Sequence, residues 1–242
     1  MKSSPSNSSH LETECLFGEM IEVLEEHLEW VYCRLITDSY CGWVPKNSLG
    51  ELKETTHRVL SLRTFVYQNM DVKSNILTYL PLGSRLVIYK IESGWAKTSI
   101  IINNKAQEGY VPSKDIVDNK HQQKDWVSIA ETLNETPYKW GGRDTIGIDC
   151  SALLQLSYQT YGQNIPRNSS QQIKLKKKEI DNFDNLKRGC VIFWKGHVGI
   201  MIDKVSCIHA NAFHMKTTIE PLVKIIDRMN KTTNIIKMMD FN

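Results

Sequence analysis

The sequence predicts a multidomain protein in which two small all-β barrels precede an α+β domain with an antiparallel sheet. Two observations lead to this prediction. The first half of the chain repeats itself at matched spacing, and the second half changes to a helical pattern followed by short apolar runs. We place the expected domains at residues 1–58, 59–118 and 119–242.

The composition is that of an ordinary folded protein. Of the 242 residues, 41% are hydrophobic and 24% are charged, with a net charge of +3. This composition excludes a disordered chain, and so mild a charge argues against a nucleic-acid partner. The Ser-rich start, MKSSPSNSSH, lacks the apolar core of a signal peptide, and no stretch approaches the roughly 18 apolar residues of a membrane helix. We therefore expect a cytoplasmic protein with no membrane partner.

An internal repeat defines the first half of the chain. Gly18 precedes Trp30 by twelve residues, and Gly83 precedes Trp95 by the same twelve. Each copy then ends in Gly, an aromatic residue, Val and Pro, at residues 42–45 and 109–112. Short alternating segments between turn-like stretches indicate strands rather than helices. Each copy is therefore expected to form a small barrel of about five strands.

The pattern changes after a polar linker at residues 119–124. Asp125 is placed to cap a first helix, and a second, largely apolar helix is predicted at residues 150–161, ended by Gly162. From Cys190 onward, short apolar runs separated by glycines indicate antiparallel strands. A buried helix against such a sheet is an α+β arrangement.

Six cysteines are present without a C-x-x-C pair, which gives no support to a zinc site. Most are expected to be buried small residues with free thiols. Cys150 differs, because it follows Asp149 at the start of the apolar helix, where unpaired amides and the helix dipole favour a thiolate. It is the candidate nucleophile. The alternative is a small residue that fills the start of a packed helix.

His197 is the candidate general base. It alternates within a strand-like apolar run, and closely flanking glycines leave space around its ring. A core histidine bonded to a backbone carbonyl is the alternative. His209 lies twelve residues further on, which suits the neighbouring strand of a hairpin, and it is a candidate to orient the base. His214 and Asn211 are the rival candidates for that role.

Five separated segments carry a resemblance to a known family. They are PYKWGG at 137–142, GIDCS at 147–151, IPR at 165–167, GHVG at 196–199 and IHA at 208–210. Together they resemble the NlpC-type papain-like cysteine peptidases, over about residues 125–242. The repeated copies resemble bacterial SH3 domains, and the combination is similar to the γ-D-glutamyl-L-diamino acid endopeptidase branch. The fold implied is two SH3-like barrels followed by an α+β papain-like domain.

The resemblance implies roles in catalysis. Cys150 would attack the γ-carbonyl of D-Glu, with His197 as base and His209 orienting it. Tyr138 would donate its hydroxyl to the oxyanion beside the Cys150 amide, although an aromatic residue packed at a turn is the alternative for Tyr138. No metal and no cofactor are needed, because the cysteine supplies the nucleophile.

The resemblance also implies substrate contacts, from Asp149, Ser151, Ser169, Tyr40 and Trp140. Asp149 would bind the free amine of L-Ala, and the two serines would contact the D-Glu carboxylate. Tyr40 of the first barrel would close over the N-terminal residue. Helix capping is the alternative for Asp149, and a surface loop position is the alternative for Tyr40.

The chain departs from the branch at two positions close to these residues. Asn168 stands where the branch has Asp, which puts the detail of the Ser169 loop in doubt. Ala152 stands where the family usually has Gly, a change that favours the helix.

The predicted function is cleavage of the γ-D-Glu to diamino acid bond in murein tripeptides or tetrapeptides with a free N-terminal L-Ala, as part of cell-wall peptide recycling. An amidase or acyltransferase that uses the same Cys–His pair is an alternative. A non-catalytic wall-binding SH3 module is another, and it gives no reason for Cys150, His197 and His209 to occur together. The preference for diaminopimelate or Lys and the oligomeric state stay open.

Overall fold

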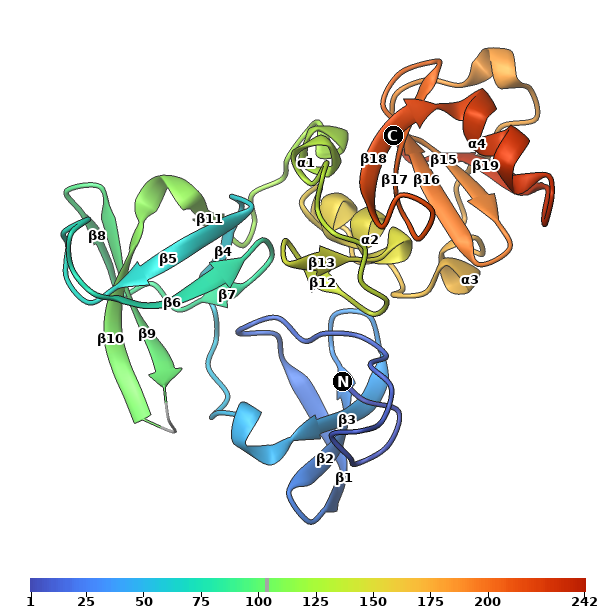
Figure 1. The fold of residues 1–242 in the computed structure, drawn as a ribbon. Coiled ribbons are helices and arrows are strands. Elements are labelled where there is room, and N and C mark those ends of the chain that lie inside the picture. Colours follow the sequence, from blue (N-terminus) through green and yellow to red (C-terminus); the bar gives the residue numbers. More distant parts are fainter. Residues whose placement is uncertain (103–104) are drawn as a thin grey trace. The chain divides into compact units, whose positions relative to one another are not determined.

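The computed structural model describes residues 1–102 and 105–242. The chain divides into two compact units, Met1–His121 and Gln122–Asn242 (Figure 1). Each unit is described by itself. The three domain ranges expected from the sequence stay a prediction.

The first copy of the repeat forms a three-stranded antiparallel sheet in the order β1-β2-β3. Its strands are β1 (Ile21–His27), β2 (Trp30–Leu35) and β3 (Cys41–Pro45). The buried residues of its core come mainly from β2 and β3, together with the N-terminal residue: Met1, Val31, Cys33, Leu35 and Val44. The inward and outward alternation along β2 is the pattern expected of a strand with one buried face.

The second copy and its flanks form two further antiparallel sheets, ordered β6-β5-β10-β9-β8 and β11-β4-β7. The strands are β4 (His57–Val59), β5 (Arg63–Tyr67), β6 (Ile76–Pro81), β7 (Arg85–Leu86), β8 (Lys90–Glu92), β9 (Trp95–Ile102), β10 (Lys105–Pro112) and β11 (Ile116–Asp118). They enclose a core of their own that includes Val59, Val66, Leu86, Ile100 and Val111.

The repeat seen in the sequence is also present in the backbone. Gly18 and Gly83 both adopt positive φ, at 76° and 86°, in the left-handed region that glycine enters without steric cost. In both copies the tryptophan pairs with the closing proline. The two pairs are Trp30 with Pro45 and Trp95 with Pro112. The copies therefore share turns and strand register, while a complete SH3-like barrel for each copy stays a prediction.

The second unit contains an antiparallel sheet of six strands in the order β14-β19-β15-β16-β17-β18. These strands are β14 (Lys178–Glu179), β15 (Cys190–Trp194), β16 (His197–Met201), β17 (Ser206–Asn211), β18 (Lys216–Pro221) and β19 (Ile235–Asp240). A two-stranded ladder of β12 (Arg143–Asp144) and β13 (Gly147–Ile148) precedes it. The antiparallel strands predicted beyond Cys190 are therefore confirmed.

Helices cover both faces of this sheet (Figure 1). They are α1 (Trp126–Thr132), α2 (Cys150–Gln159), α3 (Ser169–Gln172) and α4 (Leu222–Met229). Helix α2 contacts β16 and β17. On β15, Ile192 packs in one cluster with Leu222 and Ile225 of α4, whereas Phe193 points to the other face, near Phe241. Because both faces are covered, every residue of β15 is buried.

Both predicted helix starts are capped as expected. The Asp125 carboxylate accepts a hydrogen bond from the Ser128 N–H at 3.3 Å, and Asp149 accepts one from the Ala152 N–H at 2.8 Å. Helix α2 ends at Gln159, two residues before the predicted end, and Gly162 follows with φ of +90°. The cap at Asp149 fixes the position of the residue after it.

The six cysteines are free thiols, and four of them are buried: Cys33, Cys150, Cys190 and Cys207. In the described ranges, no helix has the length and apolar character needed to cross a membrane.

Candidate active site

Cys150 is the first residue of α2 and is 7% exposed. The backbone N–H groups of Val198 and Ser151 lie near enough to its sulfur to lower the pKa of the thiol. Val198 follows His197 on β16, the strand that α2 contacts. The buried thiol therefore lies beside the strand that carries the candidate base.

His197 begins β16, and His209 lies in the adjacent strand β17. The Nε2 atom of His197 and the Nδ1 atom of His209 are 2.8 Å apart, a hydrogen-bonding distance. The hairpin predicted from the spacing of twelve residues thus brings the two imidazoles together. Because Nε2 of His197 is engaged, its Nδ1 atom is the one that can take a proton from a thiol.

The two rival candidates for the orienting group take other positions. The Asn211 amide nitrogen lies 3.2 Å from His209 Nε2. His214 lies in the turn after β17, and its Nε2 atom is 3.3 Å from Glu220. Within the described part of the chain, His209 is the candidate hydrogen-bonded to His197.

The glycines on either side of His197 have structural roles, one in a turn and one in the packing of a neighbouring strand. Gly196 adopts φ of +74° in the turn before β16. At Gly199 an added Cβ would lie 2.6 Å from the sulfur of Cys207 and 3.6 Å from the Cβ of His209. The absence of a side chain at Gly199 therefore lets β17 approach with both of these side chains on one face.

Burial opposes charge on both the nucleophile and the base in the free protein. Burial raises the pKa of the Cys150 thiol to about 12, and the nearby Asp149 carboxylate acts in the same direction. Burial, together with the charges of His209 and Arg228, lowers the pKa of His197 to about 3. Burial thus opposes the thiolate that the helix start is predicted to favour, and a thiolate at Cys150 stays a prediction. Attack from the neutral pair is coupled to transfer of the thiol proton to the imidazole.

The backbone of Tyr138 pairs with Ile148, two residues before the nucleophile. Its N–H donates to the Met215 carbonyl at 2.9 Å, which ties the turn at 137–142 to the segment before β18. Burial, together with the charges of Cys150 and Asp149, raises the pKa of the Tyr138 hydroxyl to about 12. The phenol is therefore protonated at neutral pH and able to donate a hydrogen bond.

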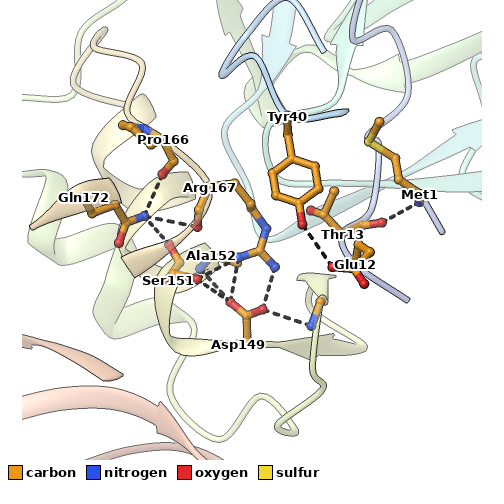
Figure 2. A network of polar contacts seen from close by, with 11 residues as sticks. Met1, Glu12, Thr13, Tyr40, Asp149, Ser151, Ala152, Pro166, Arg167 and Gln172 are labelled. Carbon is orange, nitrogen blue, oxygen red and sulfur yellow. Dashed lines mark hydrogen bonds and ion pairs between the residues drawn. The ribbon is translucent and has the colours of Figure 1, made fainter. Parts of the chain in front are cut away.

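Asp149 lies at the centre of a buried polar network (Figure 2). Its two oxygens accept five hydrogen bonds, from Gly141 N–H at 3.0 Å, Ser151 Oγ at 3.1 Å, Ala152 N–H at 2.8 Å, Arg167 Nη1 at 2.9 Å and Arg167 Nη2 at 2.6 Å. Arg167 is 1% exposed and also donates to Ser151 Oγ at 2.8 Å. One ion pair thus joins the turn, the start of α2 and the segment before α3.

Asp149 and Ser151, two of the residues predicted to contact the substrate, are already hydrogen-bonded within this network. The Asp149 carboxylate is already matched by the Arg167 guanidinium, and the Ser151 hydroxyl is hydrogen-bonded to both. Helix capping, the alternative given for Asp149, is present. Binding of a substrate amine or carboxylate by these residues stays a prediction.

The remaining predicted contacts are more exposed. Ser169 is the first residue of α3, and Trp140 is 69% exposed in the turn that carries Tyr138. Tyr40 belongs to the other unit, where its hydroxyl donates to Glu12 Oε2 at 3.2 Å (Figure 2). Its role as a lid stays a prediction.

The roles of two charged residues were not predicted from the sequence. Arg167 belongs to the IPR segment at 165–167, which marks it as a residue of interest, but no sequence pattern indicates that it pairs with Asp149. Glu220 lies at the end of β18, with its Oε1 atom 2.9 Å from His209 Nε2, and Arg228 of α4 donates to both of its oxygens. No sequence motif pointed to Glu220.

The neutral His197 predicts a loss of stability in mild acid. The folded protein keeps His197 neutral down to a pKa of about 3, whereas the unfolded chain protonates this histidine below its ordinary pKa of 6.5. Above pH 6.5 the group therefore costs no stability. As the pH falls from 6.5 toward 3, proton binding favours the unfolded chain. We expect the free energy of urea unfolding to fall between about pH 6.5 and pH 5, by up to about 1.4 kcal/mol per pH unit for each such histidine. The His197→Asn variant should show a shallower fall over this range, and an unchanged slope would contradict the assignment.

Two protein-family models match this chain, one in each unit. Residues 135–232 match the NlpC/P60 family, and residues 1–49 match the bacterial dipeptidyl-peptidase SH3 domain. The first match spans Tyr138, Cys150, His197, His209 and the Asp149 network.

Curated relatives match over most of the chain. The chain is 28% identical to the gamma-D-glutamyl-L-lysine dipeptidyl-peptidase of Bacillus subtilis (strain 168), over 83% of this chain and 72% of that protein. It is 24% identical to the dipeptidyl-peptidase 6 of Lysinibacillus sphaericus, over 86% of this chain and 82% of that protein. The crystal structure of an NlpC/P60 family protein from Bacillus cereus ATCC 10987 has the same fold, with a TM-score of 0.75 and 22% identity, over 87% of this chain and 77% of that one. The chain therefore carries an NlpC/P60 domain at residues 135–232 behind a bacterial dipeptidyl-peptidase SH3 domain at residues 1–49.

Proposed function

We propose that this protein is a cysteine endopeptidase that hydrolyses the bond between γ-D-glutamate and the diamino acid of murein peptides. The relatives named gamma-D-glutamyl-L-lysine dipeptidyl-peptidase align over 83% and 90% of the chain. The observation that carries the proposal is the thiol of Cys150 beside the strand of His197, which is hydrogen-bonded to His209 within the NlpC/P60 domain.

The site supports a two-step acyl transfer. The Cys150 sulfur bonds to the γ-carbonyl carbon of D-Glu as its proton passes to His197, and the carbonyl oxygen becomes an oxyanion. His197 then returns the proton to the departing amine of the diamino acid, which leaves a thioester. A water molecule attacks this thioester and gives one proton to His197, which passes it to the departing sulfur. The product leaves as the γ-carboxylic acid and loses its remaining proton to solvent.

Two groups support stabilisation of the oxyanion. The backbone N–H of Cys150 lies at the start of α2, where amides have no partner within the helix. The Tyr138 hydroxyl is protonated, and the backbone of Tyr138 pairs with Ile148, two residues before Cys150. We assign both as hydrogen-bond donors to the oxyanion.

The finer specificity is part of the proposal. We assign Asp149 to the free amine of the N-terminal L-Ala, Ser151 and Ser169 to the carboxylate of D-Glu, Trp140 to substrate binding, and Tyr40 to closure over the N-terminal residue. The Arg167 guanidinium holds the Asp149 carboxylate in one orientation. An amine would have to displace one of the five hydrogen bonds that the Asp149 carboxylate accepts.

Blocking the substrate amine tests this specificity. We expect L-Ala-γ-D-Glu to be released from free tripeptides and tetrapeptides, whereas N-acetylated peptides are cleaved at least about 100-fold more slowly because an acetylated amine has no charge to pair with Asp149. Mass analysis of the digests, with both Lys and diaminopimelate peptides, measures the products and the preference at the third position.

The outcomes of that digest separate the alternatives. Equal rates on free and blocked peptides would remove Asp149 and Tyr40 from their assigned roles. Release of ammonia, or transfer of the glutamyl group to an added amine, would indicate an amidase or an acyltransferase. Peptide binding without any product would indicate a wall-binding module.

Location stays a prediction. An enzyme that recycles imported murein fragments would act in the cytoplasm, and cell fractionation followed by immunodetection would test this.

A further inference from the structure

A line of hydrogen bonds continues from the catalytic histidines to a carboxylate. His197 Nε2 lies 2.8 Å from His209 Nδ1, and His209 Nε2 lies 2.9 Å from Glu220 Oε1. Glu220 belongs to β18, the strand next to β17. The carboxylate thus meets His209 at the nitrogen that does not face His197.

Glu220 is held as an anion. Arg228 of α4 donates to both of its oxygens, with Nη1 at 3.2 Å from Oε2. The other titratable groups that face Glu220 are His209, His214 at 3.3 Å and the buried Cys207 thiol. Burial alone would raise the pKa of Glu220, but the hydrogen bonds from Arg228 and His209 hold it at about 2. At neutral pH this carboxylate can only accept hydrogen bonds.

The Glu220 carboxylate, which can only accept, determines which nitrogen of His209 and of His197 carries the hydrogen. His209 Nε2 must carry a hydrogen to bond Glu220, so neutral His209 has a bare Nδ1 atom. That bare atom must receive its hydrogen from Nε2 of His197. Neutral His197 consequently has its lone pair on Nδ1, the nitrogen available to the Cys150 thiol.

The nearby Asn211 amide does not reverse this assignment. Its nitrogen lies 3.2 Å from His209 Nε2, but its hydrogens are also placed to reach the carbonyls of His209 and Lys216, at 3.3 Å and 3.4 Å. Its oxygen accepts from the His214 N–H at 2.8 Å, which fixes the amide orientation. A charged carboxylate at 2.9 Å is the stronger partner of His209 Nε2.

We propose that Glu220, held by Arg228, is a positioning residue that sets the tautomers of both histidines and so presents the base to Cys150. The proposal rests on the proposed function for its catalytic consequence but not for the tautomers themselves. Glu220 acts through His209 and does not touch the reacting atoms. Its charge also stabilises the imidazolium that forms when the thiol proton is transferred.

The Glu220→Gln variant tests this role. Glutamine has nearly the same size, but its amide can donate as well as accept, so it no longer dictates the proton on His209 Nε2. We expect nitrogen-15 NMR of labelled histidine to show the Nε2–H tautomer of His209 in the native protein and a substantial Nδ1–H population in the variant. We also expect kcat for the murein tripeptide to fall about 100-fold with KM little changed, since a wrong tautomer removes the base but not the binding site.

A matched control and a double variant isolate the effect. Glu131→Gln removes a carboxylate from another arginine ion pair of the same unit, 2.6 Å from Arg188, and is expected to leave the His209 tautomer and kcat unchanged. In the His209→Asn variant, the introduced side-chain oxygen is an acceptor for the His197 hydrogen whatever residue 220 is. Adding Glu220→Gln to this variant should therefore cost no further activity. Glu220→Asp keeps the charge and is expected to retain the Nε2–H tautomer and more activity than Glu220→Gln.

Three outcomes would overturn the proposal: an unchanged His209 tautomer in Glu220→Gln, an equal loss of kcat in the His209→Asn background, or Glu220→Asp as impaired as Glu220→Gln. The NMR measurement needs no substrate. If the protein does not cleave murein peptides, the tautomer change still decides the role of Glu220, so the two failures are distinguishable.

Discussion

Cys150→Ala is expected to abolish release of L-Ala-γ-D-Glu from a murein tripeptide, with kcat/KM falling at least about 10⁴-fold, because the sulfur supplies the bond that replaces the scissile amide. The substitution removes one buried atom at the first residue of α2 and leaves the cap at Asp149 in place. Mass analysis of timed digests measures the loss. Circular dichroism shows whether the fold is kept.

Cys15→Ala is the matched control for this experiment. Cys15 is an exposed free thiol in the other unit, so its removal should leave the rate unchanged. Retained turnover in Cys150→Ala would exclude the thiol mechanism. A loss of turnover in both variants would point to a general effect of cysteine removal rather than to a nucleophile at residue 150.

Arg167→Met is expected to destabilise the second unit by about 3–5 kcal/mol, because it leaves the Asp149 carboxylate buried without its countercharge. The side chains of Arg167 and Asp149 are only 1% and 9% exposed, so water cannot replace the lost partner. Urea unfolding followed by tryptophan fluorescence measures the change. Activity should fall as well, because the ion pair joins the start of α2 to the segment before α3.

Two comparisons make the test of the ion pair specific. Lys237→Met breaks the pair with Glu179, which is 59% exposed, and should cost no more than about 1 kcal/mol. Adding Asp149→Asn to Arg167→Met should recover part of the loss, because the buried charge is gone. Equal costs for Arg167→Met and Lys237→Met would contradict the importance assigned to this network.

The burial of the catalytic pair also has a mechanistic consequence. Burial raises the pKa of Cys150 and lowers that of His197, so both shifts act against a thiolate–imidazolium pair in the free protein. Charge separation is therefore favoured mainly as the sulfur attacks. Groups that stabilise the separated charges, such as the Tyr138 hydroxyl and the amide N–H groups at the start of α2, therefore act mainly on the transition state.

Several features followed from the sequence alone because their causes are local. A carboxylate before an apolar helical run caps the helix, so Asp149 identified the start of α2 and placed Cys150 there. The alternation of apolar residues predicts strands around His197 and His209, and their separation of twelve residues predicts that the strands are neighbours in a hairpin, as they are. Matched glycines identified the repeat, and both adopt the same left-handed turn.

The tertiary structure decided everything that depends on partners far apart in the chain. Arg167 and Asp149 are separated by 18 residues, and Glu220 reaches His209 from the next strand, so the role of each charge appears only once the elements are packed. The sheet order, with β19 between β14 and β15, likewise brings together strands that are far apart in the sequence. The sequence by itself determined which residue is the candidate nucleophile and which is the candidate base. Only the tertiary structure decided the direction in which their pKa values shift, because burial and distant charges, and not neighbours in the sequence, set the pKa of each.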